Sequence, residues 1–184
     1  MANSGQHSQQ REAIHRALPR LYKFALVLTA NEDLGRALLR STCKTLLSAQ
    51  SDWREEDPAR LTNAFRRMYS LWSAKIAEEP DLVKKCPPDP RIFASTFAKG
   101  PLAGNVQFGK FIADLPAAQR GVLYLVYGEG ASYDEATEIT QLNMLTLMKL
   151  LARGHLALTD WLDGNGGGGG MSLRIDPSGR ERAA

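Results

Sequence analysis

Several cations recur at helical spacing, which makes them the first candidates for a binding site. Arg36, Arg40 and Lys44 follow one another at steps of four residues, so on a helix they form a stripe along one edge. Such a stripe suits the phosphates of DNA or the acidic side chains of a partner helix. An ordinary solvated surface has the same pattern, and the spacing leaves both interpretations open.

A second group combines cations with aromatic rings. Arg66 and Arg67 are followed closely by Tyr69 and Trp72. Cations beside rings can hold strand-separated DNA, because each base stacked on a ring contributes about 1–3 kcal/mol. Aromatic residues at helical spacing more often belong to a core, and this second interpretation also stays open.

The sequence lacks the motifs that mark the common enzyme and metal sites. It contains no GxSxG, no HExxH, and no P-loop or GxGxxG phosphate cradle. The histidines have no ligand spacing, and the two cysteines, Cys43 and Cys86, form no CxxC. We therefore expect no catalysis, no metal and no cofactor, and two reduced thiols.

Charge is distributed unevenly along the 184 residues, which carry a net charge of +3. Residues 11–76 hold 12 Lys and Arg against 7 Asp and Glu, whereas residues 112–158 hold 3 against 5. This imbalance indicates two modules with different electrostatic roles. No apolar run approaches the ~20 residues that span a bilayer, and the polar start has no signal-peptide core. We expect a cytoplasmic protein that does not contact membranes.

Hydrophobic periodicity predicts an all-α fold with two helical bundles. The first, over residues 11–77, contains helices at His15–Leu28 and Leu34–Ala49 and a third from Pro58 to Ile76, with a polar break at 29–33. Residues 78–110 are rich in proline and glycine, which predicts a linker with a short helix near Arg91–Phe97.

Residues 111–163 have the spacing of a helix-turn-helix bundle. A helix is expected at Ala117–Tyr127, and Ser132 and Glu135 form a capping-box pattern before a short helix at Tyr133–Thr140. A turn and a longer helix at Leu145–Leu162 follow. Residues 164–184 begin with a glycine run and predict a flexible tail, either native or joined through a glycine linker.

Two segments carry a resemblance to a known family. The run from Phe24 to Asp33 and the helix after it resemble region 2 of bacterial extracytoplasmic-function sigma factors. Leu115–Leu125 and Glu129–Ala136 are similar to the start of their region 4. The resemblance implies a protein that binds core RNA polymerase, melts the −10 promoter element with region 2 and reads the −35 element with region 4.

The sequence departs from the family at the positions that matter for this function. Gly35-Arg36-Ala37 stands where region 2 usually has an acidic cluster, and the recognition helix has few cations. The pattern around Arg60, Phe65 and Trp72 is also similar to the sigma-like domain of PhyR-type stress regulators. That resemblance implies a sigma mimic, which binds an anti-sigma factor and does not itself read DNA.

The two hypotheses use different residues of the chain. With the register that the family implies, DNA contacts are expected from Thr146, Lys149, Arg153, His155, Arg66 and Arg67. Partner contacts are expected from Arg36, Arg40, Lys44, Leu39, Tyr69 and Trp72. The partners implied are core RNA polymerase, promoter DNA and an anti-sigma factor. The sigma factor is the first hypothesis and the mimic is the alternative.

Overall fold

The structure, a computed structural model, describes residues 3–48, 58–96 and 105–165, and within these ranges it contains helices and no strand. The predicted all-α fold is therefore confirmed. The elements are α1 (Asn3–Thr29), α2 (Glu32–Ser48), α3 (Pro58–Glu78), α4 (Leu82–Lys85), α5 (Pro90–Thr96), α6 (Val106–Asp114), α7 (Ala117–Leu123), the π-helical turn η1 (Tyr124–Gly128), α8 (Tyr133–Thr140) and α9 (Met144–Asn165).

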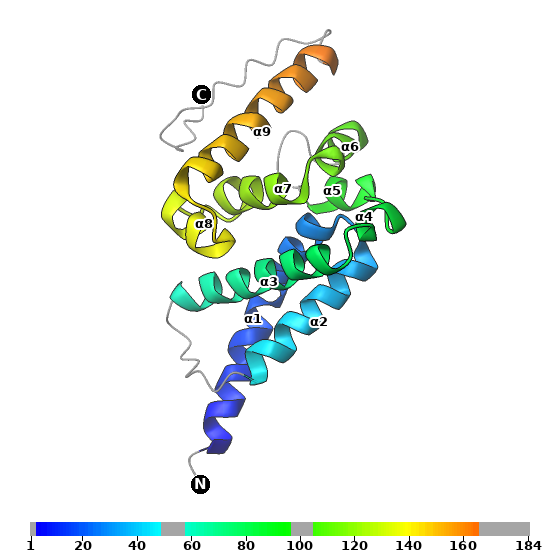
Figure 1. The fold of residues 1–184 in the computed structure, drawn as a ribbon. Helices are drawn as coiled ribbons and strands as arrows, with labels where there is room; N and C mark the ends of the chain where they lie inside the picture. The colour runs from blue at the N-terminus through cyan, green and yellow to red at the C-terminus, as the bar shows by residue number, and fades with distance from the viewer. Residues whose placement is uncertain (1–2, 49–57, 97–104, 166–184) are drawn as a thin grey trace.

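Helices α1, α2 and α3 form the lower bundle of Figure 1. The polar break between α1 and α2 is confirmed: Ala30 has a left-handed backbone with φ of 51°, and the Asn31 side chain accepts a hydrogen bond of 3.1 Å from the Leu34 N–H. Helix α1 begins well before His15. The predicted start was wrong because it depended on apolar periodicity, which the preceding polar residues lack.

The segment between the bundles is helical and partly buried. It contains α4, α5 and most of α6, and α5 confirms the short helix expected near Arg91, although Phe97 lies outside the described residues. Leu82, Phe93 and Phe108 are buried in the core. The proline-rich segment therefore packs against its neighbours as short helices, and the exact domain boundaries stay a prediction.

Helices α6 to α9 form the upper part of the molecule (Figure 1). The helix expected at Ala117–Tyr127 is present but changes to π-helical geometry at Tyr124. The capping box at Ser132 and Glu135 is formed, and Gln141 turns the chain with φ of 57° between α8 and α9. Helix α9 continues through Gly164 to Asn165, past the predicted end, whereas the rest of the expected tail lies outside the described residues.

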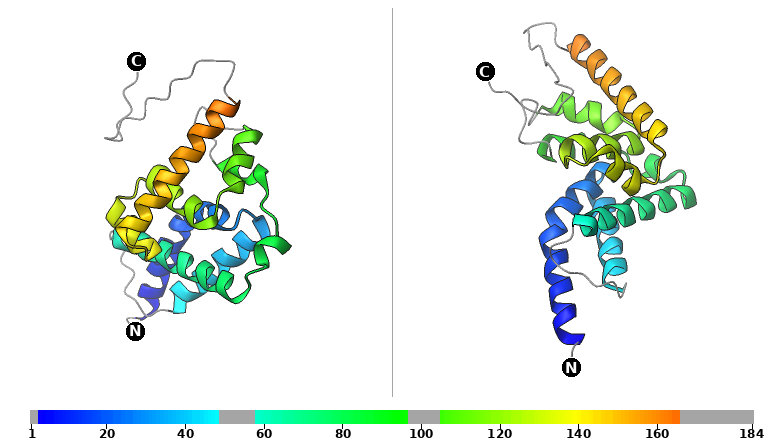
Figure 2. Two further views of the ribbon diagram at one scale, coloured as in Figure 1. Left: turned by 45° about the horizontal axis from the view of Figure 1, so that its top comes forward. Right: turned by 90° about the vertical axis from the view of Figure 1, so that its left-hand side faces the viewer.

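The two bundles share one hydrophobic core. Helix α1 runs up into the upper helices, and α3 packs against α8 while α1 packs against α7 (Figure 2). The centroid of the Phe24 ring lies 5.0 Å from that of Phe65, in an edge-on arrangement, and 5.9 Å from that of Tyr124, in a stacked arrangement. Gly121 permits this approach, because a Cβ there would lie 2.9 Å from the Leu28 side chain. In this conformation the bundles are packed together as one body.

A buried arginine joins the two bundles through the backbone. The Arg120 side chain donates hydrogen bonds of 2.8 and 3.0 Å to the carbonyls of Val27 and Leu28, near the end of α1. It also donates to the carbonyls of Ala113 and Leu115, where α6 turns into α7. The last carbonyls of a helix have no partner within the helix, so Arg120 satisfies groups that burial would otherwise leave unpaired.

A second polar contact crosses the junction at Glu129. Its carboxylate has only 8% of its surface exposed and accepts hydrogen bonds of 2.7 Å from Arg20 Nε and 2.5 Å from the Tyr124 hydroxyl. Burial and this hydrogen bond raise the pKa of Tyr124 well above its ordinary value. The contact links Arg20 of α1 to Tyr124 of η1 through Glu129, the residue that follows η1.

We expect Arg120→Met to lower the free energy of unfolding by about 2–4 kcal/mol, because buried carbonyls lose charge-assisted hydrogen bonds. Urea unfolding at pH 7 measures the change. Arg66→Met is the control, because the Arg66 side chain is 41% exposed and its removal should change stability by less than about 0.5 kcal/mol. Equal stability of Arg120→Met and the unmodified protein would contradict the role assigned to Arg120.

Candidate functional site

Local caps fix the starts of α8 and α9. The Ser132 hydroxyl accepts a hydrogen bond of 3.2 Å from the Glu135 N–H, and the Glu135 carboxylate accepts one of 2.8 Å from the Ser132 N–H. The bonds that the Glu135 carboxylate accepts from the N–H and from the hydroxyl of Ser132 lower the pKa of Glu135. At the start of α9 the Asn143 side chain accepts a hydrogen bond of 2.8 Å from the Thr146 N–H. Leu147 and Leu151 then anchor α9 in the core.

The opposite side of α9 carries exposed apolar side chains. Leu145 is 64% exposed, Met148 51% and Leu156 66%, and Ala152 lies between them. Their spacing places them along one side of a helix over about 16 Å. We call this strip, made of Leu145, Met148, Ala152 and Leu156, the outer face of α9. Three large exposed apolar side chains in a row are unusual on a surface without a partner.

The predicted DNA-binding residues of α9 are only partly brought together. Lys149 and Arg153 are exposed, stand four residues apart and border the outer face. Thr146 is half-buried. His155 lies on the other edge of the helix, about 200° around the axis from Arg153, with its ring centroid 5.3 Å from that of Tyr127. Among these four, Lys149 and Arg153 form the one cationic edge.

The basic stripe expected on α2 is present and exposed. Arg36 forms an ion pair with Glu32 four residues before it, and hydrogen bonding to Tyr22 and Glu32 raises the pKa of Arg36. Arg40 and Lys44 have no carboxylate within ion-pair distance among the described residues. Leu39 is not on this stripe: it is half-buried and packs against the core. Helices α1 and α2 pack against each other.

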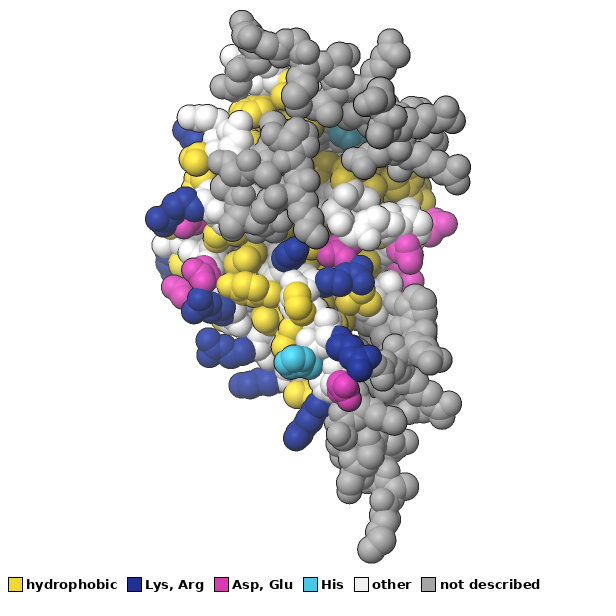
Figure 3. Space-filling model, turned by 180° about the vertical axis from the view of Figure 1, so that it is seen from behind, with side chains coloured by type: hydrophobic (Ala, Val, Ile, Leu, Met, Phe, Trp, Pro, Cys, Tyr) yellow, Lys and Arg dark blue, Asp and Glu magenta, His cyan; other side chains and the backbone are white. Residues whose placement is uncertain are grey.

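The face formed by α1 and α2 is predominantly basic. On the side of the molecule shown in Figure 3, Lys and Arg side chains surround a strip of hydrophobic side chains, with few carboxylates among them. Exposed cations come from both helices, and they include Arg16, Arg20, Lys23, Arg36, Arg40 and Lys44. This face can attract an acidic partner or a nucleic acid backbone.

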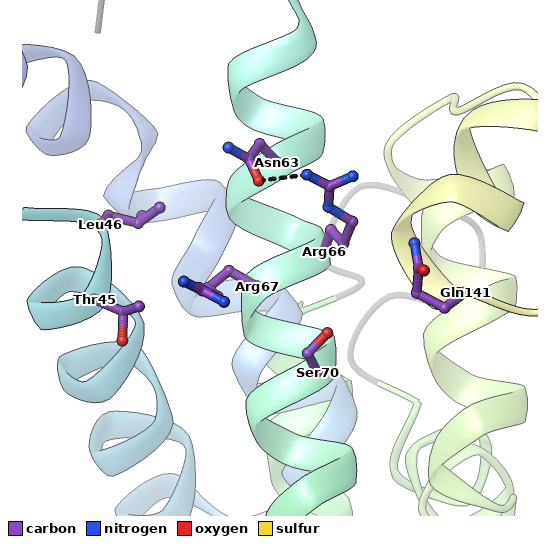
Figure 4. A pocket seen from close by; sticks show the side chains of 7 residues that line it. All are labelled: Thr45, Leu46, Asn63, Arg66, Arg67, Ser70 and Gln141. Atoms are coloured by element: carbon purple, nitrogen blue, oxygen red, sulfur yellow. Dashed lines mark hydrogen bonds between the residues drawn. The ribbon is translucent and has the colours of Figure 1, made fainter. Parts of the chain in front are cut away.

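Arg66 and Arg67 lie at a polar pocket between the bundles (Figure 4). The pocket has a volume of about 340 Å³ and is lined by α2, α3 and Gln141. Arg66 donates a hydrogen bond of 3.0 Å to Asn63 and lies 3.5 Å from the Glu138 carboxylate of α8. Arg67 is exposed and points toward α2. The two arginines therefore face different neighbours.

The aromatic residues that follow these arginines are in the core. Tyr69 is 8% exposed and Trp72 is 5% exposed, and burial raises the pKa of Tyr69. In this conformation both rings are part of the core, and neither is available to stack on a base or to contact a partner. Their role in partner binding stays a prediction.

Sequence reasoning did not single out Arg120 or Glu129. Both are polar residues whose partners lie about 100 positions away in the chain, at Val27 and Leu28 for Arg120 and at Arg20 for Glu129. No local spacing signals such pairs. Leu145 and Leu156 fall within the helix expected at Leu145–Leu162, and only the structure shows that they face outward.

The described residues offer no group of three or more His, Cys, Asp and Glu that could hold a metal ion. Within the same part of the chain, no helix has the length and apolar character needed to cross a membrane.

The fold has a counterpart among solved structures. The chain is similar to the sigma factor RpoE in a co-crystal structure with the anti-sigma factor NepR from Bartonella quintana, with a TM-score of 0.63 and 21% sequence identity. The match covers 83% of this chain and 96% of that chain. No protein-family model matches the chain, and no curated protein matches its sequence. The described chain therefore has a sigma-factor-like fold.

We expect Ser132→Ala to lower the free energy of unfolding by about 1 kcal/mol at pH 7, because α8 loses its cap. The pKa of Glu135 is lower in the folded protein than in the unfolded chain. The contribution of the Glu135 carboxylate to the free energy of unfolding is therefore complete above the ordinary glutamate pKa of about 4.3. It is lost as the pH falls through the pKa of Glu135 in the folded protein. Urea unfolding at pH 7 and pH 3 should show a smaller difference between variant and parent at pH 3.

The matched control for the cap is Asp134→Asn, because Asp134 is in the same helical turn and does not take part in the capping box. A constant difference between Ser132→Ala and the parent at both pH values would contradict the link to Glu135.

Proposed function

We propose that this protein is a sigma-like regulator of transcription initiation that binds a helical anti-sigma factor. The observation that carries the proposal is the outer face of α9, which is apolar where a DNA-reading helix needs cations and hydrogen-bonding groups. The fold supports it as well, since the similar solved structure is a sigma factor in complex with an anti-sigma factor.

The outer face of α9 suits one amphipathic helix. An apolar strip of three helical turns matches the spacing of side chains on a partner helix that lies along it. Burial of each large apolar side chain contributes about 1.5–3 kcal/mol, so Leu145, Met148 and Leu156 can supply most of the affinity.

Lys149 and Arg153 favour an acidic flank on that partner. They border the apolar strip and remain exposed, and no described carboxylate forms an ion pair with either of them. Rim pairs of this kind contribute about 0–1 kcal/mol each, so they select the orientation of the partner more than its affinity. Binding should therefore depend only weakly on salt.

A second candidate is a sigma factor that binds core RNA polymerase and promoter DNA directly. The observation that favours it is the basic face of α1 and α2 together with the exposed pair Lys149 and Arg153. Two phosphate contacts from α9 correspond to a slope of log affinity against log salt of about −1.8. Such a slope distinguishes promoter binding from binding of a helix to an apolar strip.

We expect the double variant Leu145→Ser and Leu156→Ser to weaken binding of an anti-sigma factor of the NepR type at least about 30-fold, because two apolar contacts are lost. Fluorescence anisotropy with the labelled anti-sigma factor at 50 and 200 mM salt measures the affinity. The matched control is Lys149→Ala with Arg153→Ala on the same helix, which should weaken binding by less than about fivefold. Equal losses in both double variants would contradict the apolar strip as the main contact.

Promoter binding gives the opposite pattern. If the protein reads DNA, its complex with core polymerase should bind a labelled promoter with steep salt dependence, and Lys149→Ala with Arg153→Ala should lower affinity about tenfold or more. We expect neither effect. The sigma factor would be favoured over the mimic by the following result: Leu145→Ser with Leu156→Ser leaves the promoter complex intact, and loss of the two cations abolishes it.

A further inference from the structure

A second cavity lies inside the upper part of the molecule. It has a volume of about 360 Å³, within the range of pockets that hold small molecules. Helices α6, α7 and α9, the turn η1 and Val27 of α1 contribute to its walls. The wall side chains are predominantly apolar or aromatic, and they include Phe108, Phe111, Ile112, Leu123, Tyr124 and Leu158. Neither of the functions proposed above uses this cavity.

One wall of the cavity carries a positive charge. Arg120 lines the cavity and is 5% exposed. Its side chain donates hydrogen bonds to backbone carbonyls, and its Cζ lies 5.8 Å from the centroid of the Phe93 ring. No described Asp or Glu forms an ion pair with it. Desolvation lowers the pKa of Arg120 to about 10, so the guanidinium remains charged at neutral pH. The charge is therefore solvated by dipoles but not neutralised.

Among the described residues, one N–H group of Arg120 has no hydrogen-bond acceptor. A guanidinium has five N–H groups, and four of them are used: one at Nε, two at Nη1 and one at Nη2. The second N–H of Nη2 has no hydrogen-bond partner among the described residues. Because Arg120 is also one of the residues that line the cavity, a ligand with an anionic group suits this position.

We propose that this cavity binds a small amphipathic carboxylate, with its carboxylate on Arg120 and its alkyl or aryl body among the apolar walls. The carboxylate supplies a negative charge opposite Arg120 and accepts a hydrogen bond from its unused N–H. The apolar body replaces water against the phenylalanine and leucine side chains, which supplies affinity in proportion to the buried area.

Tyr127 and His155 line the cavity at the surface of the upper part. Tyr127 is 53% exposed, the centroid of its ring is 5.3 Å from that of His155, and both residues line the cavity, from η1 and α9. A π-helical turn such as η1 is frequent at binding sites, because it shifts side chains from their regular positions.

Occupation of the cavity should stabilise the packed arrangement of the two bundles. A ligand there contacts Val27 of α1 together with α7 and α9, so it touches elements of both bundles at once. The ligand therefore binds the folded, packed state in preference to the unfolded chain. This inference does not depend on which partner the protein binds.

The test uses octanoate, with octanol and octylamine as ligands of equal chain length. At ten times its dissociation constant, octanoate should raise the melting temperature of the full chain by about 2–4 °C. Octanol should bind at least about tenfold more weakly, and octylamine should not bind. Equal shifts with octanoate and either of the other two ligands would overturn the proposal, because the charge of Arg120 would then have no role.

Variants of α9 locate the binding. Leu158→Trp fills the cavity and should abolish the octanoate shift, whereas Leu156→Trp, two residues earlier on the exposed outer face, should retain it. A full shift in Leu158→Trp would overturn the proposal. Methyl NMR of the unmodified protein is a second measurement, which does not depend on a variant folding. Octanoate should move the signals of Leu123 and Leu158 and leave those of Leu145 unchanged, and the reverse pattern would overturn the site.

Discussion

The structure depends on the end of α1, where a helix finishes inside the protein and its last carbonyls need donors. The Leu26 carbonyl accepts a hydrogen bond from Ala30, and those of Val27 and Leu28 accept from Arg120. A cation at a helix C-terminus also interacts favourably with the helix dipole. Because Arg120 belongs to α7, satisfying these carbonyls fixes α7 against α1 and so joins the two bundles.

The position of α7 in turn determines the orientation of α9. A Cβ at Gly154 would lie 2.9 Å from the Leu123 side chain, so α9 approaches α7 closely at this glycine. With Leu147 and Leu151 also in the core, the helix cannot rotate, and Leu145 and Leu156 must face outward. The exposed apolar strip is therefore a consequence of how α9 is packed. Its apolar side chains stay in water until a partner covers them, which is the physical basis for proposing a helical partner.

The two bundles share a core, and this limits what each surface can do. Tyr69 and Trp72 belong to that core, so the aromatic rings of α3 contribute to stability in this conformation. The cations remain outside, on α1 and α2, at the polar pocket of Arg66 and Arg67, and along one edge of α9. Beside the apolar strip, a partner meets Lys149 and Arg153 on one edge of α9. Charge complementarity then selects an acidic, amphipathic partner over a neutral one.

The sequence by itself determined the local structure of this protein: the helices, the polar break after α1, the capping box at Ser132 and the turn between α8 and α9. These features depend on residues three or four positions apart, whose types report helical geometry directly. The exposed stripe of Arg36, Arg40 and Lys44 was predictable for the same reason. Only the tertiary structure decided that His155 turns away from Arg153, that Trp72 is buried and that Arg120 binds the end of α1. Those facts depend on contacts between residues about 100 positions apart, or on which side of a helix the core covers, and no local pattern encodes them.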